Sequence, residues 1–145
     1  MTPDILFSLT SPIAMIGWVL LAVSPLAPRY ILPVAGLVLP GVLSLVYVAL
    51  ILAFWTSAEG GFDSLASVML LFDTPGVALA GWVHFLAFDL FVGGWIARNA
   101  RALGVSHIWV LLCLPFTFLF GPSGLVLWLV LRVFLSKSTP KENSA

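Results

Sequence analysis

Two side chains that can transfer protons, His84 and Asp89, lie within one apolar stretch, residues 80–98. A carboxyl group and an imidazole are a common acid and base in enzymes. On an α-helix, their spacing of five residues corresponds to about 140° of rotation and about 7.5 Å of rise. They therefore do not share a helix face, but they can flank one cavity if the helix lies between two neighbours.

Composition places these groups in a membrane. Of the 145 residues, 61% are hydrophobic and 8% are charged, whereas soluble domains have about 25% charged residues. A charge in hydrocarbon costs about 3 kcal/mol or more, so a carboxyl there indicates function unless a structural partner explains it. The first three hydrophobic segments contain no Lys or Arg. An unpaired carboxyl in such surroundings favours its protonated form, which suits a general acid.

The hydrophobic segments predict an all-α, multi-pass integral membrane protein. We expect it in a bacterial inner membrane. We expect one transmembrane domain, residues 1–135, with spans at about 5–23, 30–55, 75–97 and 108–135, and a polar tail at 136–145. About 20 apolar residues suffice to cross a bilayer. Apolar residues at helical spacing between the second and third spans predict a short interfacial helix, with Ser64 as its N-cap.

The fourth segment contains the sequence FGPSG at residues 120–124, which predicts a helix break. By helix rise the break reaches about the depth of Asp89, where freed backbone N–H groups could bind the carboxylate. We interpret the fold as a four-helix transmembrane bundle with a broken fourth helix. A re-entrant hairpin that turns at Gly121 and Pro122 is the alternative. It would place all six basic residues on one side and the acidic loop opposite.

Asp89 and His84 also have explanations that involve no chemistry. Asp89 can simply tie the third helix to the broken fourth one, and His84 can be a hydrogen-bonded core histidine. The single cysteine, Cys113, excludes a cysteine-built metal cluster. Because His84 and His107 lie about 21 Å apart by helix rise, one haem iron cannot bind both. Haem bound through His84 alone stays open, but we expect neither a metal nor a cofactor, and the zero net charge argues against nucleic acid.

Residues 81–91, GWVHFLAFDLF, resemble the W-[IV]-H-x-L-x-x-D-L-F stretch of the neoxanthin-synthase (abscisic-acid-deficient-4-like) membrane protein family, including its bacterial branch. The Leu71-Phe72 pair, the F-x-P-x-G break and the four-span layout are also similar to that family. The family commonly has Arg at the position of Gly94, but Arg98 lies one turn further on and can reach back.

The resemblance implies an isomerase that opens an epoxycarotenoid, violaxanthin, to the allenic neoxanthin, or a related carotenoid conversion. In that hypothesis Asp89 is the acid and His84 is the base. The expected substrate-binding residues, mostly flat apolar walls, are Trp82, Phe85, Phe88, Phe120, Gly121 and Pro122.

Other functions stay open. The main alternative is a non-catalytic carotenoid- or lipid-binding accessory subunit of a membrane complex. A haem- or quinone-linked redox protein and a small oligomeric transporter, with Asp89 as its proton site, are further alternatives. Gly93-Gly94 and Gly76 with Ala80 form small faces that allow close helix contact, by default within one chain, although a homo-oligomer is also possible.

Overall fold

A computed structural model of the chain describes residues 2–135, which contain helices and no strand. The all-α prediction is therefore confirmed for this part of the chain. The helices are α1 (Pro3–Ala22), α2 (Pro28–Pro33), α3 (Leu39–Phe54), α4 (Leu65–Phe72), α5 (Pro75–Ala102), α6 (His107–Phe120) and α7 (Pro122–Leu135). The predicted polar tail, residues 136–145, lies outside the described residues.

Three helical stretches are long and apolar enough to cross a membrane: Pro3–Ala22, Pro28–Ser57 and Pro75–Ala102. The second stretch joins α2 and α3 through a π-helical turn, η2 (Val34–Val38). In its most apolar part only 17% of the residues are buried, whereas the corresponding value for α5 is 56%. Apolar side chains that the protein leaves uncovered require lipid around them, so the protein is integral to a membrane.

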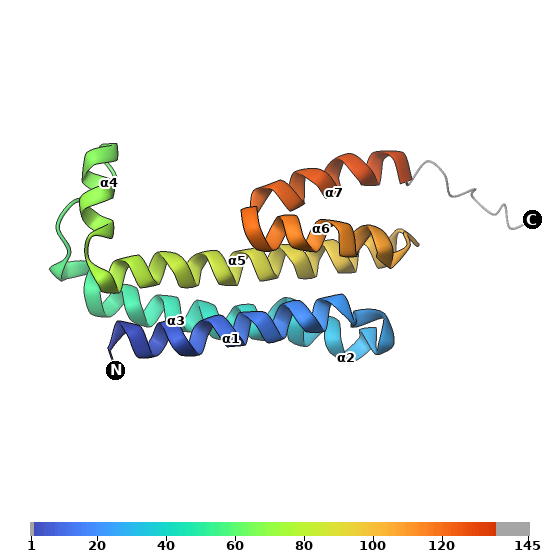
Figure 1. Ribbon diagram of the computed structural model, residues 1–145, viewed down its shortest axis with the longest axis horizontal. Helices are drawn as coiled ribbons and strands as arrows, with labels where there is room; N and C mark the ends of the chain where they lie inside the picture. The colour runs from blue at the N-terminus through green and yellow to red at the C-terminus, as the bar shows by residue number, and fades with distance from the viewer. Residues whose placement is uncertain (1, 136–145) are drawn as a thin grey trace, which may run out of the picture.

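Helix α5 is the central element of the fold. Figure 1 shows α1 and α3 along one side of it and the α6–α7 pair along the other. Helix α4 projects crosswise from the end of the bundle where α5 begins. It is the short helix expected after Ser64, whose hydroxyl oxygen accepts a hydrogen bond from the Ser67 N–H at 3.1 Å.

The small residues of α5 pack against other helices of the same chain. A Cβ atom added at Gly94 would lie 2.5 Å from the Gly36 Cα of η2, and one at Gly93 would lie 2.8 Å from the Trp18 ring of α1. Glycine at both positions therefore lets α1 and η2 approach α5 closely, as small residues do in membrane helix pairs.

The fourth hydrophobic segment folds differently from the expected kinked span. Helices α6 and α7 have 14 residues each, or about 21 Å of rise, which is shorter than a hydrocarbon core of about 30 Å. The two helices pack side by side, and the chain reverses between them (Figure 1). The Trp128 indole N–H of α7 donates to the Asn99 side-chain oxygen near the end of α5, at 3.0 Å. The structure therefore does not confirm a fourth spanning helix, and the reversal of the chain matches the hairpin alternative.

Local geometry explains the reversal. Gly121 has a φ of +45°, a conformation that disfavours residues with a Cβ atom. The Ser123 hydroxyl donates to the Phe116 carbonyl at 3.1 Å and ties the start of α7 to the end of α6. Gly124 packs so closely on Thr117 that a Cβ atom would overlap that residue. These contacts hold α7 against α6 rather than in line with it.

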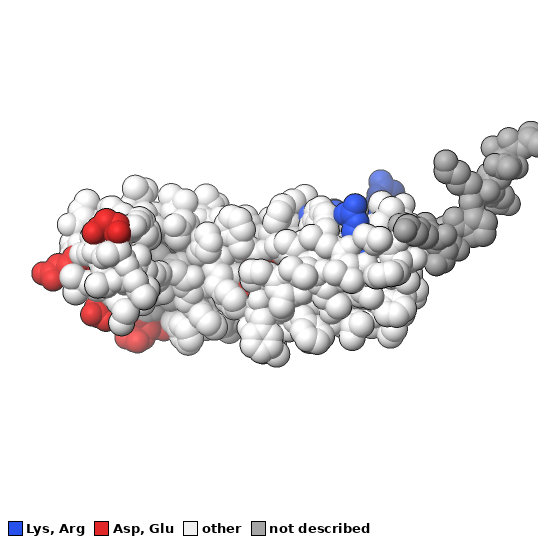
Figure 2. Space-filling view, turned by 90° about the horizontal axis from the view of Figure 1, so that it is seen from above, with Lys and Arg blue, Asp and Glu red and all other residues white. Residues whose placement is uncertain are grey.

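The hairpin separates the charges of the described residues. Figure 2 shows the acidic side chains at one end of the molecule and the arginines at the other. Asp4 lies in the first turn of α1, and Glu59, Asp63 and Asp73 flank α4 at the first end. Arg29 lies in α2, Arg98 and Arg101 lie in the last turns of α5, and Arg132 lies in the last turn of α7, toward the second end. This is the distribution that the hairpin alternative predicts, although Lys137 and Lys141 lie outside the described residues.

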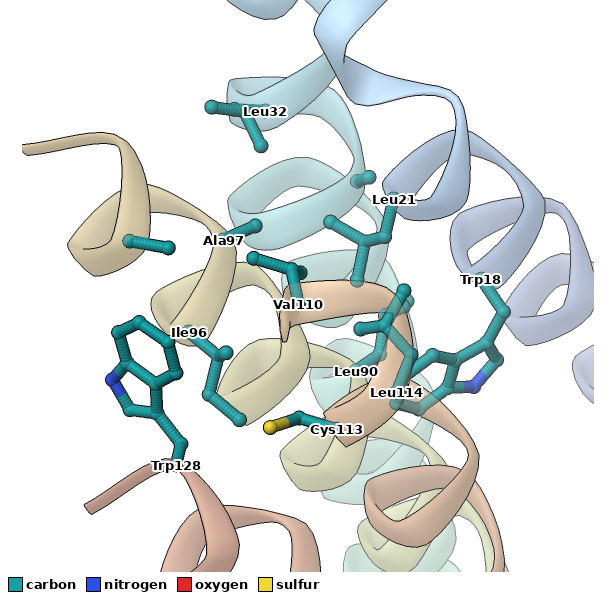
Figure 3. Close-up of a cluster of buried hydrophobic side chains, with 12 residues drawn as sticks. Trp18, Leu21, Leu32, Leu90, Ile96, Ala97, Val110, Cys113, Leu114 and Trp128 are labelled. Atoms are coloured by element: carbon teal, nitrogen blue, oxygen red, sulfur yellow. The ribbon is translucent and has the colours of Figure 1, made fainter. Parts of the chain in front are cut away.

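A buried cluster fixes the hairpin to the rest of the bundle. In Figure 3, Ile96 of α5, Cys113 of α6 and Trp128 of α7 converge, and all three are fully buried. Trp18 and Leu21 of α1 close the same cluster. Burial of a large apolar side chain contributes about 1.5–3 kcal/mol, so these contacts hold the hairpin in one position beside α5.

Candidate functional site

The Asp89 carboxyl group lies against the hairpin turn. Asp89 is near the middle of α5 and is 8% exposed. A Cβ atom added at Gly121 would lie 2.6 Å from the Asp89 Oδ1 atom. The sequence reasoning thus brought together the correct pair of residues, the intramembrane carboxyl and the glycine of the break.

The expected hydrogen bonds at this contact are missing. The Asp89 Oδ2 atom is buried and has no hydrogen-bond partner among the described residues. The Gly121 N–H instead donates to the Thr117 carbonyl at 2.9 Å, and the Gly124 N–H donates to the Gly121 carbonyl at 3.3 Å. The break therefore supplies close packing but does not satisfy the carboxyl group. A buried polar atom without a partner is costly and rare, which makes it a candidate for binding a ligand or a proton.

An aromatic cavity of about 240 Å³ lies along the face of α5 that carries Asp89, although Asp89 itself is not in its lining. Trp82 and Phe85, which precede Asp89 by about two turns and one turn, line it together with Phe118 near the hairpin tip. The Trp82 indole N–H donates to the Ser11 hydroxyl of α1 at 3.3 Å. Two predicted substrate-binding residues therefore share a face with the acid.

Ser11 is a site residue that the sequence reasoning missed. It lines the same cavity as Trp82 and Phe85. A polar side chain within an apolar segment was the available sign of a functional contact.

His84 lies on a different face of α5. Its ring stacks on Phe88, with ring centres 4.5 Å apart, and contacts Tyr47 of α3 at 5.4 Å. The His84 side chain is exposed on the surface of the protein, whereas Asp89 is buried against the hairpin. The structure therefore does not bring the predicted acid and base together, in agreement with their helical spacing of about 140°.

Phe88 lines an open groove between α3 and α5, on the side away from the hairpin. This groove has a volume of about 430 Å³ and is also lined by Phe91 and Ser44. The Arg98 guanidinium lies 5.9 Å from the centre of the Phe91 ring, over its face. The predicted aromatic walls are thus divided between two sides of α5.

The remaining predicted residues form the hairpin tip. Phe120 ends α6 and is 65% exposed, and Pro122 begins α7. Proline is well accommodated at a first helical position because the N–H it lacks would have no helical partner there. Gly121 contacts Asp89 directly, whereas Phe120 points its apolar ring toward the surroundings of the protein.

Arg98 reaches back toward Gly94. Its Nη1 atom lies 3.3 Å from the position that a Cβ atom on Gly94 would occupy. The same atom donates to the Gly36 carbonyl at 3.4 Å. The guanidinium therefore occupies the space beside Gly94, on the α3 side of α5, where it does not approach Asp89.

Comparison with known proteins places the chain in a family. No curated protein and no solved structure matches it. The family model described as ABA DEFICIENT 4-like matches residues 5–128, from α1 into α7, including Asp89 and the hairpin turn. Because the match covers most of the sequence and all of the candidate site, the chain belongs to the ABA DEFICIENT 4-like family.

Proposed function

We propose that the protein binds a carotenoid within a bacterial inner membrane and isomerises it, with Asp89 as the acid. Membership of the ABA DEFICIENT 4-like family suggests a carotenoid-related membrane protein. The observation that carries the catalytic part is the buried Asp89 Oδ2 atom without a partner. A carboxyl that only fastened two helices would form hydrogen bonds between them, and this one forms none among the described residues.

The chemistry needs one proton to leave the acid and one to return. In the conversion of an epoxycarotenoid to an allene, the carboxylic acid of Asp89 protonates the epoxide oxygen as its carbon–oxygen bond breaks. The resulting carboxylate removes a proton from the adjacent polyene carbon. The electron pair of that carbon–hydrogen bond forms the second double bond of the allene. The acid is restored, the product has the mass of the substrate, and no oxidant or reductant is consumed.

This assignment uses one residue for both proton transfers because of the position of His84. His84 stacks on Phe88 and faces α3, and Asp89 faces the hairpin turn. We therefore assign His84 to the wall of the α3–α5 groove rather than to the reacting atoms.

The cavity beside Asp89 supports binding of an apolar ligand. Its walls are aromatic and aliphatic, from Trp82, Phe85, Leu86 and Phe118, with Ser11 as a polar group at the Trp82 side. Flat rings fit the plane of a conjugated polyene, and apolar pockets with few polar groups are typical of small-molecule sites. Its volume of about 240 Å³ suits an end portion of a carotenoid, so the rest of the chain would lie in the surrounding lipid.

A binding subunit without catalysis is the second candidate. The groove lined by Phe88 and Phe91 is open and almost entirely apolar, and Asp89 does not line it. Such a groove can hold a polyene or lipid chain without proton transfer. This function predicts bound pigment that is chemically unchanged.

The two functions are distinguished by expressing the protein in a host that makes violaxanthin and analysing its pigments by chromatography and mass spectrometry. Asp89→Asn keeps the shape of the side chain but cannot donate a carboxylic proton. Asp73→Asn changes a residue that follows α4 and lies away from the site, so it is the matched control. We expect an isomer of unchanged mass with the wild type and Asp73→Asn, and none with Asp89→Asn. Unaltered pigment on all three proteins would support the binding subunit instead.

A further inference from the structure

A second cavity lies toward the arginine end of the bundle, away from the hairpin turn and Asp89. Its volume is about 250 Å³, and its walls come from the α1–α2 connection, the last turns of α5 and the start of α6. Ser24, Arg101 and His107 are its polar side chains. Sites for drug-sized molecules have volumes of about 300–1,000 Å³, so this cavity fits a small polar group.

The Ser24 hydroxyl is the first sign of a ligand. Ser24 is only 3% exposed and lines the cavity. Its hydroxyl group has no hydrogen-bond partner among residues 2–135. The Ser24 oxygen is not among the enclosed unpaired atoms of the described residues, so this hydroxyl is accessible in the cavity wall and free to bond a group that enters from outside the fold.

The charge of the cavity indicates an anion. The Arg101 guanidinium lines it and forms no ion pair within the part of the chain that the structure describes. Apart from Asp89, the carboxylates of residues 2–135 lie toward the opposite end of the molecule (Figure 2). An arginine with free donors favours a planar or tetrahedral oxyanion.

The start of α6, which begins at His107, adds backbone donors on another wall. The His107 Nε2 atom lies 3.0 Å from the Ala22 carbonyl oxygen. Because a carbonyl only accepts, Nε2 carries the proton of this bond, which fixes the ring in the wall of the cavity. No side chain caps the N-terminus of α6, which begins at His107. Free first-turn amides and the helix dipole both favour an anion there.

We propose that this cavity binds the phosphate group of an anionic membrane phospholipid. Ser24, Arg101 and the first amides of α6 would donate hydrogen bonds to its oxygens. A phospholipid is the expected source because the cavity lies at one end of the helices, where head groups lie, between the last turns of α5 and the start of α6, and because basic pockets between such helices bind acidic head groups. Free inorganic phosphate has the same oxyanion chemistry and is compared directly in the test.

The test measures binding to the full chain in neutral detergent by native mass spectrometry. The ligands are phosphatidylglycerol, phosphatidylcholine with the same acyl chains, and inorganic phosphate. We expect phosphatidylglycerol to bind most tightly. Arg101→Gln should weaken that binding by about tenfold or more, because the bonds to be lost are charge-assisted, and Ser24→Ala by about two- to tenfold. Arg132→Gln is the matched control, since Arg132 lies toward the same end of the molecule but does not line the cavity.

Equal loss of binding in Arg101→Gln and Arg132→Gln would overturn the proposal, since it would show attraction to the basic end in general. Equal affinity for the two phospholipids, unchanged by Ser24→Ala, would also overturn it. If inorganic phosphate binds as tightly as phosphatidylglycerol and Arg101→Gln removes both, the phosphate site stands and the lipid source is rejected. A thermal unfolding curve for each variant shows that the folded protein was measured.

Discussion

Replacement of Gly121 by alanine tests the hairpin that presents Asp89, because the two possible folds predict opposite signs. In the structure Gly121 has φ +45° and ψ −94°, a backbone conformation that alanine adopts only under strain. If residues 108–135 instead formed one continuous span, Gly121 would lie inside a helix. Alanine there would stabilise the protein by about 0.8–1 kcal/mol.

The loss of stability expected for Gly121→Ala has two parts. Backbone strain at such a position is about 1–3 kcal/mol. The new Cβ atom would also lie 2.6 Å from the Asp89 Oδ1 atom, and overpacking of this kind adds about 1–3 kcal/mol. We therefore expect Gly121→Ala to lower the free energy of unfolding by about 2–6 kcal/mol.

The assay is reversible unfolding in mixed micelles, followed by tryptophan fluorescence, to which the buried Trp128 of α7 contributes. Gly41→Ala is the matched control, because Gly41 has a negative φ and nothing lies within 4 Å of the added Cβ atom. That control should be neutral or stabilising by up to about 1 kcal/mol.

Measuring Gly121→Ala in the Asp89→Ala background separates overpacking from backbone strain. Asp89→Ala removes the carboxyl group, so the overpacking part should disappear, and the double mutant should show coupling of about 1–3 kcal/mol. The backbone strain should remain. A stabilising effect of Gly121→Ala in the wild-type background would refute the hairpin, and an absence of coupling would refute the contact between Asp89 and the turn.

Three further outcomes follow from the same geometry. Trp128→Phe removes the hydrogen bond to Asn99, at 3.0 Å, and should destabilise the protein by about 0.5–1.5 kcal/mol in the same micelle assay. His84→Phe keeps an aromatic ring in the groove, so pigment conversion measured by chromatography should persist, and its loss would return His84 to the reacting centre. Single cysteines at Ser57 and Ser106, in a chain without the native cysteine, should be labelled by an impermeant maleimide from opposite sides of the membrane. Since arginine-bearing ends face the cytoplasm, Ser106→Cys should be labelled from that side.

The central features of the fold could be predicted from composition and spacing. Segments of about 20 apolar residues predict spanning helices, and Asp89 stands out because it is the only carboxyl group in the middle of such a segment. The glycines and proline at residues 121–124 predict the break, and helix rise predicts that it reaches the depth of Asp89. The contact between these two features then follows from the sequence alone.

The direction of the chain after the break could not be predicted. Both a kinked span and a hairpin bury the same apolar residues in lipid, so hydropathy does not distinguish them. The positive φ of Gly121 and the tight contact of Gly124 with Thr117 decide the fold, and both depend on three-dimensional packing. The charge distribution was the available clue, because only a hairpin places Arg132 on the same side of the membrane as Arg98 and Arg101.

Only part of the candidate site could be predicted, again because the neighbours of a side chain depend on three-dimensional packing. Helical spacing already separated His84 from Asp89, but it did not show which neighbouring helix each side chain would meet. The structure assigns His84 to α3, through Tyr47, and Asp89 to the hairpin. The contact of Arg98 with η2 depends on the π-helical turn, which no local sequence pattern indicated.

The central claim, that Asp89 is the acid of a carotenoid isomerisation, is tested most directly with purified protein in detergent supplied with violaxanthin. Wild type and Asp89→Asn are compared at equal folded concentration, and products are followed by chromatography with mass detection. We expect the wild type to form an allenic product of unchanged mass, and Asp89→Asn to form it about 10²–10⁴ times more slowly, the usual contribution of a general acid. Equal rates for the two proteins, or violaxanthin that the wild type binds and leaves unaltered, would contradict the claim.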